Sequence, residues 1–220
     1  MSVISLENIH FKYEGASQNT LAISNLSITK GERIFLYGPS GSGKSTLLEI
    51  LAGVLTPQSG SVKILGESLE KLSSSQRDQF RSKHMGYIFQ SFNLIPYLNI
   101  EENMLLPLQL KGLQNSPAEF SRLTRHLGIH ELIHRRVTDL SVGQQQRVAV
   151  ARALIGKPDI ILADEPTSAL DYEHREKFLN LLFEECDRHQ TTLVFVSHDL
   201  GLQKMFSRSV SLKEVNQVKS

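Results

Sequence analysis

The chain has 220 residues, a formal net charge of +1 and a single cysteine, Cys186. This length suits one compact domain with an inserted subdomain, and the near-neutral charge gives no reason to expect a nucleic-acid partner. A lone cysteine excludes a disulfide within the chain, so Cys186 is expected only to pack within a helix.

Apolar runs in the chain are too short to cross a membrane. A spanning helix needs about 20 apolar residues, whereas the longest runs, such as Ile160–Ala163, have the length of a strand. The N-terminus carries Glu7 and lacks the basic-then-apolar pattern of a secretory signal. If the protein acts at a membrane, another polypeptide must therefore supply the membrane-spanning part.

The N-terminal part of the chain is predicted to consist mainly of strands. In chain order these are Ile4–Tyr13, Leu21–Thr29, Ile34–Tyr37, Val62–Leu65 and Tyr87–Phe89. The first alternates between apolar and polar residues, which indicates a half-buried strand, and the second is expected to pair with it. The third is apolar throughout and leads into a glycine-rich loop, after which a helix is predicted over Thr46–Ala52.

The spacing of apolar residues changes towards the second half of the sequence. From Asn99 to about Lys157 helical spacing dominates, which predicts an inserted helical subdomain at residues 90–157 between core segments at 1–89 and 158–220. The core is then expected to continue with a strand at Asp159–Ala163, a helix at Tyr172–His189, a last strand at Thr192–Val196, a short helix and a tail. Strands that alternate with helices predict an α/β fold with a mostly parallel sheet.

The glycine-rich loop Gly38–Ser45 has the sequence GPSGSGKS, which matches the phosphate-loop pattern between a buried strand and a helix. Glycines let the backbone aim N–H groups at phosphates, and the start of the helix adds its positive dipole end. Lys44 is expected to reach the β- and γ-phosphates, and the Ser45 hydroxyl to bind Mg²⁺. The nucleotide-binding residues predicted here are Gly38, Ser40, Gly41, Ser42, Gly43, Lys44, Ser45 and Thr46.

Two carboxylates, Asp164 and Glu165, follow the apolar strand that precedes Pro166. Open α/β sheets bind ligands at the carboxyl ends of their strands, so Asp164 is suited to hold Mg²⁺ directly or through water. Because side chains alternate along a strand, Glu165 is expected to point to the other side, where it can orient or deprotonate an attacking water. Two acids can also simply begin a solvated turn, but the upstream phosphate loop favours the functional interpretation.

The segment Leu140–Arg147 has the sequence LSVGQQQR and is followed by a helical run and then by the acidic strand. This order resembles the ABC ATPase family, whose signature motif is LSGGQ, and the resemblance extends over nearly the whole chain. It implies ATP as the nucleotide and a P-loop NTPase core with a mostly parallel sheet, an N-terminal antiparallel β subdomain and an inserted helical subdomain.

The resemblance also implies roles for residues outside the phosphate loop. Tyr13 resembles the aromatic residue that stacks on adenine, with Phe11 as the alternative. Gln90 resembles the glutamine of the coupling loop, which contributes to catalysis and to the metal site. Ser168–Asp171 matches the loop that crosses the dimer interface, and His198 matches the switch histidine near the γ-phosphate.

Ser141, Gly143 and Gln144 begin the helix that follows the signature motif, and a helix N-terminus is a second anion-binding site. If the helical subdomain lies beside the core, this site cannot reach the γ-phosphate bound by its own chain. The resemblance then implies that it caps ATP held by a second copy or a paralogous subunit, in a head-to-tail dimer. ATP would then join two subunits, and hydrolysis would release them.

Val142 departs from the family pattern, which usually has glycine at the third signature position. Valine is unfavourable there if the position requires a positive φ, and costs little if the position is already helical. The site is expected to hydrolyse ATP because Ser141, Gly143 and Gln144 remain.

The segment Gln90–Leu98 and the residues after it resemble the lipoprotein-releasing and macrolide-efflux branch of the family. Phe92, Leu94, Ile95 and Tyr97 are expected to be partly exposed, and exposed apolar clusters commonly mark partner surfaces. The implied partner is an integral membrane subunit, which would place this chain peripherally at the cytoplasmic face of the membrane.

Other functional classes fit the motifs less well. A regulatory ABC ATPase that signals through a membrane partner to a cell-wall hydrolase would use the same residues and stays open. A soluble ABC ATPase of DNA repair would need a long coiled coil between Gln90 and Ser141, and translation versions carry two cassettes in one chain. A phosphate-loop kinase or GTPase gives no reason for the signature and switch motifs.

Overall fold

The computed structural model describes residues 1–168, 170 and 172–218. The chain divides into two units, of which the first comprises Met1–Arg81 with Thr192–Ser220 and the second Ser82–Thr191. Among the described helices, none is long and apolar enough to cross a membrane.

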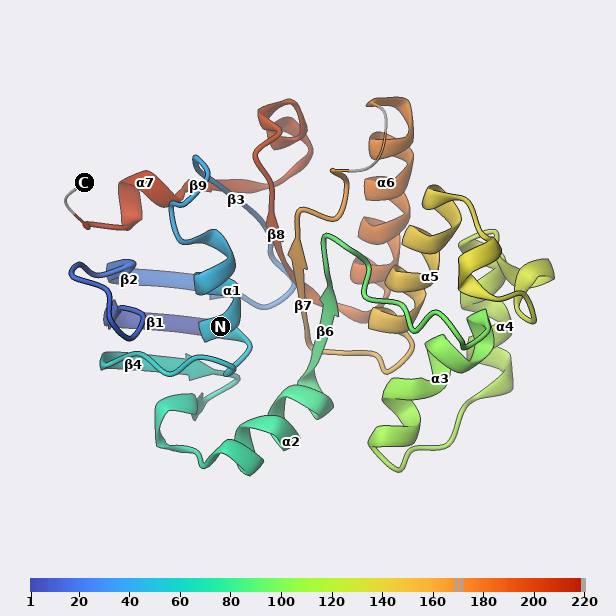
Figure 1. Ribbon diagram of the computed structural model, residues 1–220, viewed down its shortest axis with the longest axis horizontal. Coiled ribbons are helices and arrows are strands. Elements are labelled where there is room, and N and C mark those ends of the chain that lie inside the picture. The colour runs from blue at the N-terminus through green and yellow to red at the C-terminus, as the bar shows by residue number, and fades with distance from the viewer. Residues whose placement is uncertain (169, 171, 219–220) are drawn as a thin grey trace. The chain divides into compact units, whose positions relative to one another are not determined.

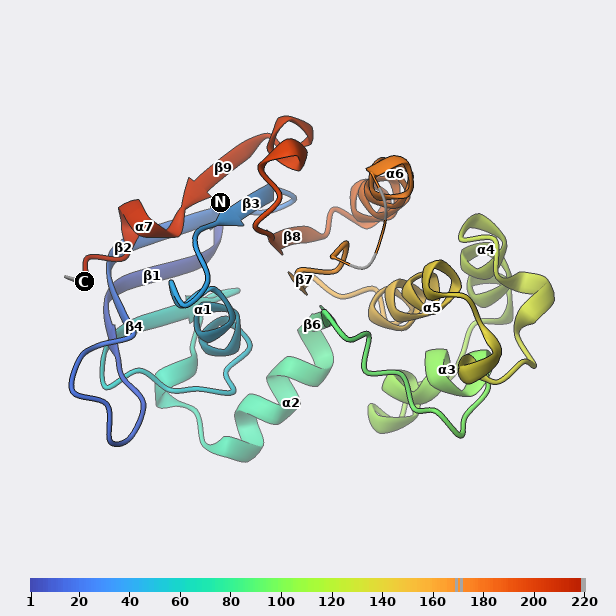
Figure 2. The ribbon, with the colours of Figure 1, turned by 45° about the horizontal axis from the view of Figure 1, so that its top comes forward.

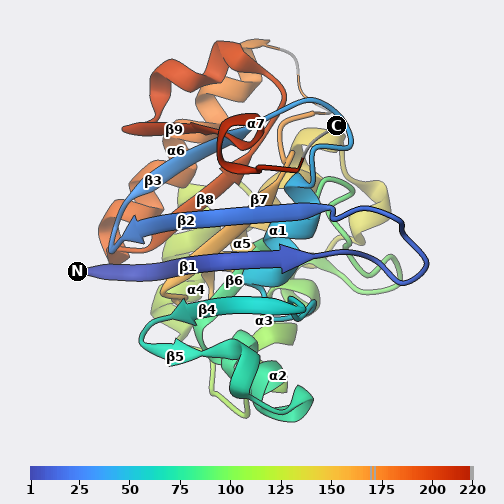
Figure 3. The ribbon, with the colours of Figure 1, turned by 90° about the vertical axis from the view of Figure 1, so that its left-hand side faces the viewer.

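The first unit contains an antiparallel sheet in the order β2-β1-β4-β5 (Figure 3). Its strands are β1 (Ser2–Phe11), β2 (Leu21–Thr29), β4 (Ser59–Ile64) and β5 (Glu67–Ser68). The predicted pairing of the first two strands is confirmed, with Leu6 opposite Leu26. Ile4 and Leu6 are fully buried, as the alternation of the sequence predicts. Ile9 is fully buried as well, because the strand is irregular at Asn8, which has a left-handed φ of 52°.

The first unit also contains parallel strands, with β3 (Arg33–Tyr37) between β8 (Thr192–Val196) and β9 (Arg208–Ser211) (Figure 2). Phe35 of β3 is fully buried and stacks on Phe195 of β8 with ring centroids 6.2 Å apart. The prediction that Thr192–Val196 is the last strand was wrong. The sequence of β9 is largely polar and forms no apolar run, so periodicity could not reveal it.

Short helices connect and flank these strands. In the first unit they are α1 (Lys44–Leu51), η1 (Leu69–Lys71), η4 (Leu200–Met205) and α7 (Leu212–Val215). Helix α2 (Ser74–His84) precedes β6 and was not predicted. None of its residues is buried, so it has no apolar stripe from which a helical period could be recognised.

The second unit combines two parallel strands with helices (Figure 1). The strands are β6 (Met85–Ile88) and β7 (Ile160–Asp164). The helices are α3 (Ile100–Leu110), α4 (Pro117–His126), η2 (His130–Leu132), η3 (Val137–Asp139), α5 (Val142–Leu154) and α6 (Tyr172–His189). The predicted helical character of residues 99–157 is confirmed, and α6 and β8 have the predicted bounds.

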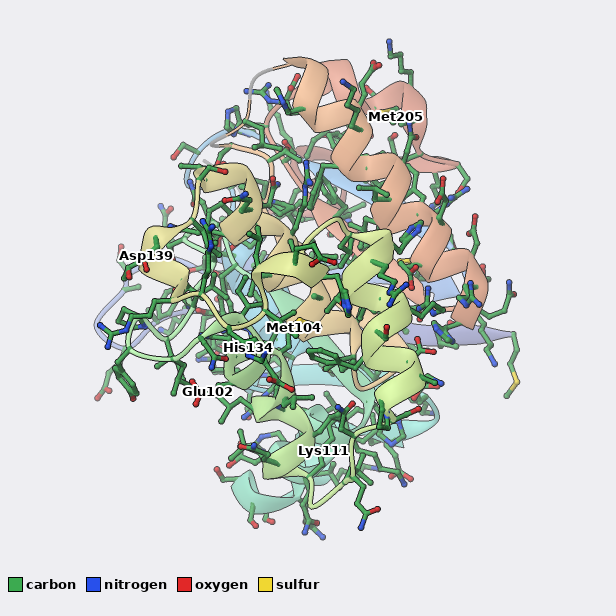
Figure 4. The ribbon with its side chains drawn as sticks, turned by 90° about the vertical axis from the view of Figure 1, so that its right-hand side faces the viewer. Glu102, Met104, Lys111, His134, Asp139 and Met205 are labelled. Atoms are coloured by element: carbon green, nitrogen blue, oxygen red, sulfur yellow. The ribbon has the colours of Figure 1, made fainter. Side chains whose placement is uncertain are left out.

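Local sequence explains where these helices begin. Asn99 caps α3 in a capping box with Glu102, and Met104 lies fully buried further along the helix (Figure 4). Ser116 caps α4 ahead of Pro117, a residue suited to the first helical position.

Helix α5 approaches β6 closely at Gly86, where an added Cβ would lie 2.4 Å from the Ala153 carbonyl oxygen.

An ion-pair cluster joins α4 and α6 within the second unit. Arg122 donates to both carboxylate oxygens of Glu185, at 2.8 and 2.7 Å, and also binds Glu119. Burial raises the pKa of Glu185, but hydrogen bonds and the positive charge of Arg122 outweigh it, so this pKa lies below its ordinary value of 4.5. A carboxyl with a lowered pKa stabilises the fold at neutral pH, and this stabilisation is lost as the pH falls through that pKa.

Replacing Arg122 with alanine should lower the free energy of unfolding at pH 7 by about 3 kcal/mol, because it leaves the charge of Glu185 buried without its partner. The deficit should shrink at pH values below 4.5, where Glu185 becomes protonated in the unfolded chain. Urea denaturation at both pH values measures this, with the exposed Arg125→Ala as the control on the same helix. An equal deficit at both pH values would contradict the electrostatic explanation.

Candidate functional site

The phosphate loop joins β3 to α1 in a conformation that requires glycine. Gly41 has a φ of 77° and Gly43 a φ of 94°, values that L side chains rarely adopt. Gly43 is the N-cap of α1 and provides no side-chain cap, so the first-turn N–H groups keep their donor capacity. An added Cβ at Gly43 would lie 2.7 Å from the end of the Leu21 side chain and 3.2 Å from the Thr20 carbonyl oxygen, so the space is also tight.

The side chains of this loop fit a phosphate ligand. Lys44 is 8% exposed, and its Nζ donates to the carbonyl oxygens of Gly38 and Pro39 at 2.9 and 3.0 Å. The Ser42 hydroxyl is buried and has no hydrogen-bond partner among the described residues. A buried hydroxyl without a partner beside a buried ammonium is the arrangement expected of a preformed anion site.

Tyr13 lies just beyond the end of β1 and is 44% exposed. Its hydroxyl is 3.1 Å from the Thr46 hydroxyl on α1, which fixes the ring beside the phosphate-loop helix. The alternative, Phe11, is 5% exposed and packs edge-on against Tyr13, with ring centroids 5.0 Å apart. Of the two rings, Tyr13 therefore offers the accessible face.

His198 follows β8 at the same edge of the parallel strands from which the phosphate loop leaves. Leu36 of β3 pairs in parallel with Val196 of β8, and the Ser197 N–H donates to the Leu36 carbonyl at 3.1 Å. His198 is exposed. The first unit thus brings Lys44, Tyr13 and His198 to one end of its strands.

The second unit has a corresponding edge at the carboxyl ends of β6 and β7. Ile88 pairs with Ala163, so the exposed Gln90 and the half-buried Asp164 leave their strands at the same edge. The expected alternation between Asp164 and Glu165 was wrong. β7 ends at Asp164, and Glu165 has a left-handed φ of 44°, so the backbone is no longer extended at that residue.

Ser141 is the N-cap of α5 and forms a capping box with Gln144. Its hydroxyl accepts from the Gln144 N–H at 3.3 Å, and its own N–H donates to the Gln144 side chain at 3.0 Å. The N–H groups of Val142 and Gly143 have no acceptor within the helix. Beside them is an open pocket of about 410 Å³, lined by Ser141, Val142, Gly143, Gln144, Arg147, Leu170 and His174.

Val142 is the first residue of α5, and it is absent from the residues with positive φ in the described chain. The condition under which valine costs little is therefore met. Its side chain is 48% exposed, so it forms part of the rim of the pocket.

Two further side chains of α5 bind loops that carry predicted site residues, and neither was identified from the sequence. Gln146 is 1% exposed and donates to the Pro166 carbonyl at 2.5 Å, one residue after Glu165. Arg152 donates to the carbonyl oxygens of Phe92 and Asn93, both at 2.6 Å. Burial lowers the pKa of Arg152.

Phe92 is 7% exposed, so the expectation that it is partly exposed was wrong. Its backbone has a left-handed φ of 60°, and that of Asn93 has a left-handed φ of 48°. Tyr97 is 76% exposed, as expected. Asp171, the last residue of the predicted interface loop, lies outside the described residues.

Comparison with known proteins decides the family. The family described as ABC transporter matches residues 21–168. The chain belongs to this family. The uncharacterized ABC transporter ATP-binding protein YbbA of Escherichia coli strain K12 is 42% identical over 206 residues, which cover 91% of this chain and 90% of YbbA.

Two further relatives agree with this assignment. The lipoprotein-releasing system ATP-binding protein LolD of Psychrobacter arcticus is 37% identical, with 96% of each chain covered. The dimeric structure of a post-hydrolysis state of the ATP-binding cassette MJ0796, bound to ADP and Pi, superposes with a TM-score of 0.86 at 36% identity, covering 99% of this chain and 98% of that one. This ABC protein is thus an ATPase that powers a transporter, and its predicted α/β fold is confirmed.

Replacing Val142 with glycine should change ATP turnover by less than about threefold, which corresponds to roughly 0.7 kcal/mol in activation free energy. The reason is that valine is already part of the helix without a positive φ, so glycine would relieve no backbone strain there. Steady-state ATPase assays measure this, with Ser141→Ala, which removes the N-cap, as the contrasting variant that loses activity. An inactive parent protein that the glycine variant rescues would contradict the interpretation.

Proposed function

We propose that this ABC ATPase drives an export system of the lipoprotein-releasing or macrolide-efflux type, as a head-to-tail dimer bound to integral membrane subunits at the cytoplasmic face. The similarity to LolD supports the branch. The observation that supports the dimer is the open pocket at the start of α5, beside two N–H groups that have no acceptor within their own helix. ATP on the phosphate loop of another copy would fill it, and that copy can be identical or paralogous.

Within one copy, Lys44 would bind the β- and γ-phosphates, and Tyr13 would stack on adenine beside Thr46. The loop backbone at Gly38, Ser40, Gly41 and Gly43 would surround the phosphates, together with the Ser42 hydroxyl that has no partner in the described chain. Ser45, Gln90 and Asp164 supply the hydroxyl, amide and carboxylate oxygens that Mg²⁺ prefers, and bound Mg²⁺ would neutralise charge on the phosphates.

Glu165 would orient and deprotonate the attacking water, and His198 would contact the γ-phosphate from the end of β8. Ser141, Gly143 and Gln144 would close the site from the other copy, with Asp171 nearby. Residues 90–157 would act as the helical subdomain and the remainder as the nucleotide-binding core. The coupling surface would be formed by the exposed Tyr97 together with the half-buried Leu94 and Ile95.

Replacing Glu165 with glutamine should retain ATP binding and lower turnover by about 100-fold or more, because a general base is lost while the shape of the side chain is kept. The variant should accumulate as a dimer in MgATP, which light scattering after size exclusion measures. The exposed Glu131→Gln is a matched control for the change in charge. Parent-like turnover in the Glu165 variant would overturn the assignment of the base.

A further inference from the structure

The segment after β9 returns to the antiparallel sheet and places Asn216 beside the phosphate loop. Helix α7 is followed by Asn216, whose backbone forms an isolated bridge with Ile23 of β2. The Gln217 N–H donates to the Ala22 carbonyl at 2.8 Å, which continues this attachment. Asn216 is therefore held by its backbone at a point where its side chain can reach loops of the nucleotide site.

The side-chain amide of Asn216 makes three hydrogen bonds. Its Oδ1 accepts from the Ala22 N–H at 2.8 Å. Its Nδ2 donates to the Thr20 carbonyl at 3.0 Å and to the Ser42 carbonyl at 3.3 Å. Because Ala22 offers a donor and the other two groups are acceptors, the partners fix which end of the amide carries oxygen.

The bond to Ser42 determines the direction of an N–H group in the phosphate loop. A trans peptide is planar, so its C=O and N–H point in opposite directions. With the Ser42 carbonyl held toward Asn216, the Gly43 N–H points away from the C-terminal segment. Gly43 is the N-cap of α1, where N–H groups are available to an anion.

The bond to Thr20 connects the same amide to the adenine-binding side of the site. Thr20 closes the loop that begins after β1, and its N–H donates to the Phe11 carbonyl at 2.7 Å. Tyr13 belongs to this loop and is attached to α1 through Thr46. The Thr20 carbonyl oxygen also lies 3.2 Å from the Cβ position at Gly43, so the two loops are in contact.

We propose that Asn216 is a positioning residue of the nucleotide site, which presets the Gly43 N–H for phosphate and holds the Tyr13 loop against the phosphate loop. This proposal rests on the proposed role of the phosphate loop in ATP binding. Asn216 acts through these backbone groups and does not itself touch the nucleotide. Its loss should therefore weaken nucleotide binding more than it slows the chemical step.

The test uses Asn216→Asp in the full chain. The carboxylate can still accept from the Ala22 N–H, but it cannot donate to Thr20 and Ser42 and repels both carbonyl oxygens. The dissociation constant for ATP, measured with a fluorescent analogue, should rise about tenfold, which is about 1.4 kcal/mol. KM for ATP should rise by a similar factor, with a smaller change in kcat. Gln217→Glu makes the same change of amide to acid one residue later, on an exposed side chain, and should bind ATP as the parent does.

The outcomes separate this proposal from the proposed function. If the parent chain binds no ATP, or binds it equally well after Lys44→Ala, the phosphate-loop assignment fails. If the parent binds ATP through Lys44 and Asn216→Asp binds it equally well, the role of Asn216 fails. Asn216→Ala, which introduces no charge, replaces the aspartate variant if thermal unfolding shows that the latter does not fold. A lower melting temperature with unchanged affinity in either variant would also overturn the proposal.

Discussion

Side chains of α5 hold the loops of the second unit that carry proposed site residues, by hydrogen bonds to backbone carbonyls. Gln146 holds Pro166, which follows the proposed base, and Arg152 holds Phe92 and Asn93, which follow Gln90. Left-handed backbone at a residue other than glycine costs about 1–3 kcal/mol and persists only where the surroundings over-determine it. Two charge-assisted bonds from one planar guanidinium provide such surroundings for Phe92 and Asn93. The same helix presents Ser141 at its start, so the proposed anion site and the loop of the proposed coupling surface share one rigid support.

The fold could be predicted from the sequence wherever burial leaves a periodic pattern. The strands of the core and α6 follow from apolar runs and helical spacing, and their locations are confirmed. Helix α2 and strand β9 were not predicted, because α2 buries none of its residues and β9 has a largely polar sequence. Strand β9 forms by pairing with β3, and α2 is attached through hydrogen bonds from Arg77 and Arg81 to the carbonyl oxygens of Gly53 and Ala52. A local sequence pattern contains neither of these distant contacts.

The site was predictable where chemistry requires a particular residue at a particular place in a short motif. Lys44 and the glycines of the phosphate loop are of this kind. Gly41 and Gly43 have the positive φ values that favour glycine, whereas the binding of phosphates by Lys44 stays a prediction. The supporting residues Arg152 and Asn216 were not predictable, because each acts on backbone groups far along the chain. The role of Gln146 could have been inferred from one feature of the sequence. Gln146 shares a helical face with the buried Ala149 and Val150, and a buried polar side chain on such a face needs a hydrogen-bond partner.

The contact at Gly86 has a consequence for how the protein tolerates change. A methyl group there would collide with the Ala153 carbonyl, a main-chain atom that cannot rotate aside. To avoid this collision, α5 would have to move away from β6. That movement would displace Ser141 at one end of the helix and would disturb the hydrogen bonds of Arg152 at the other end. Gly86 has no reactive group, yet adding a single methyl group there is expected to impair the coupling of ATP hydrolysis to transport.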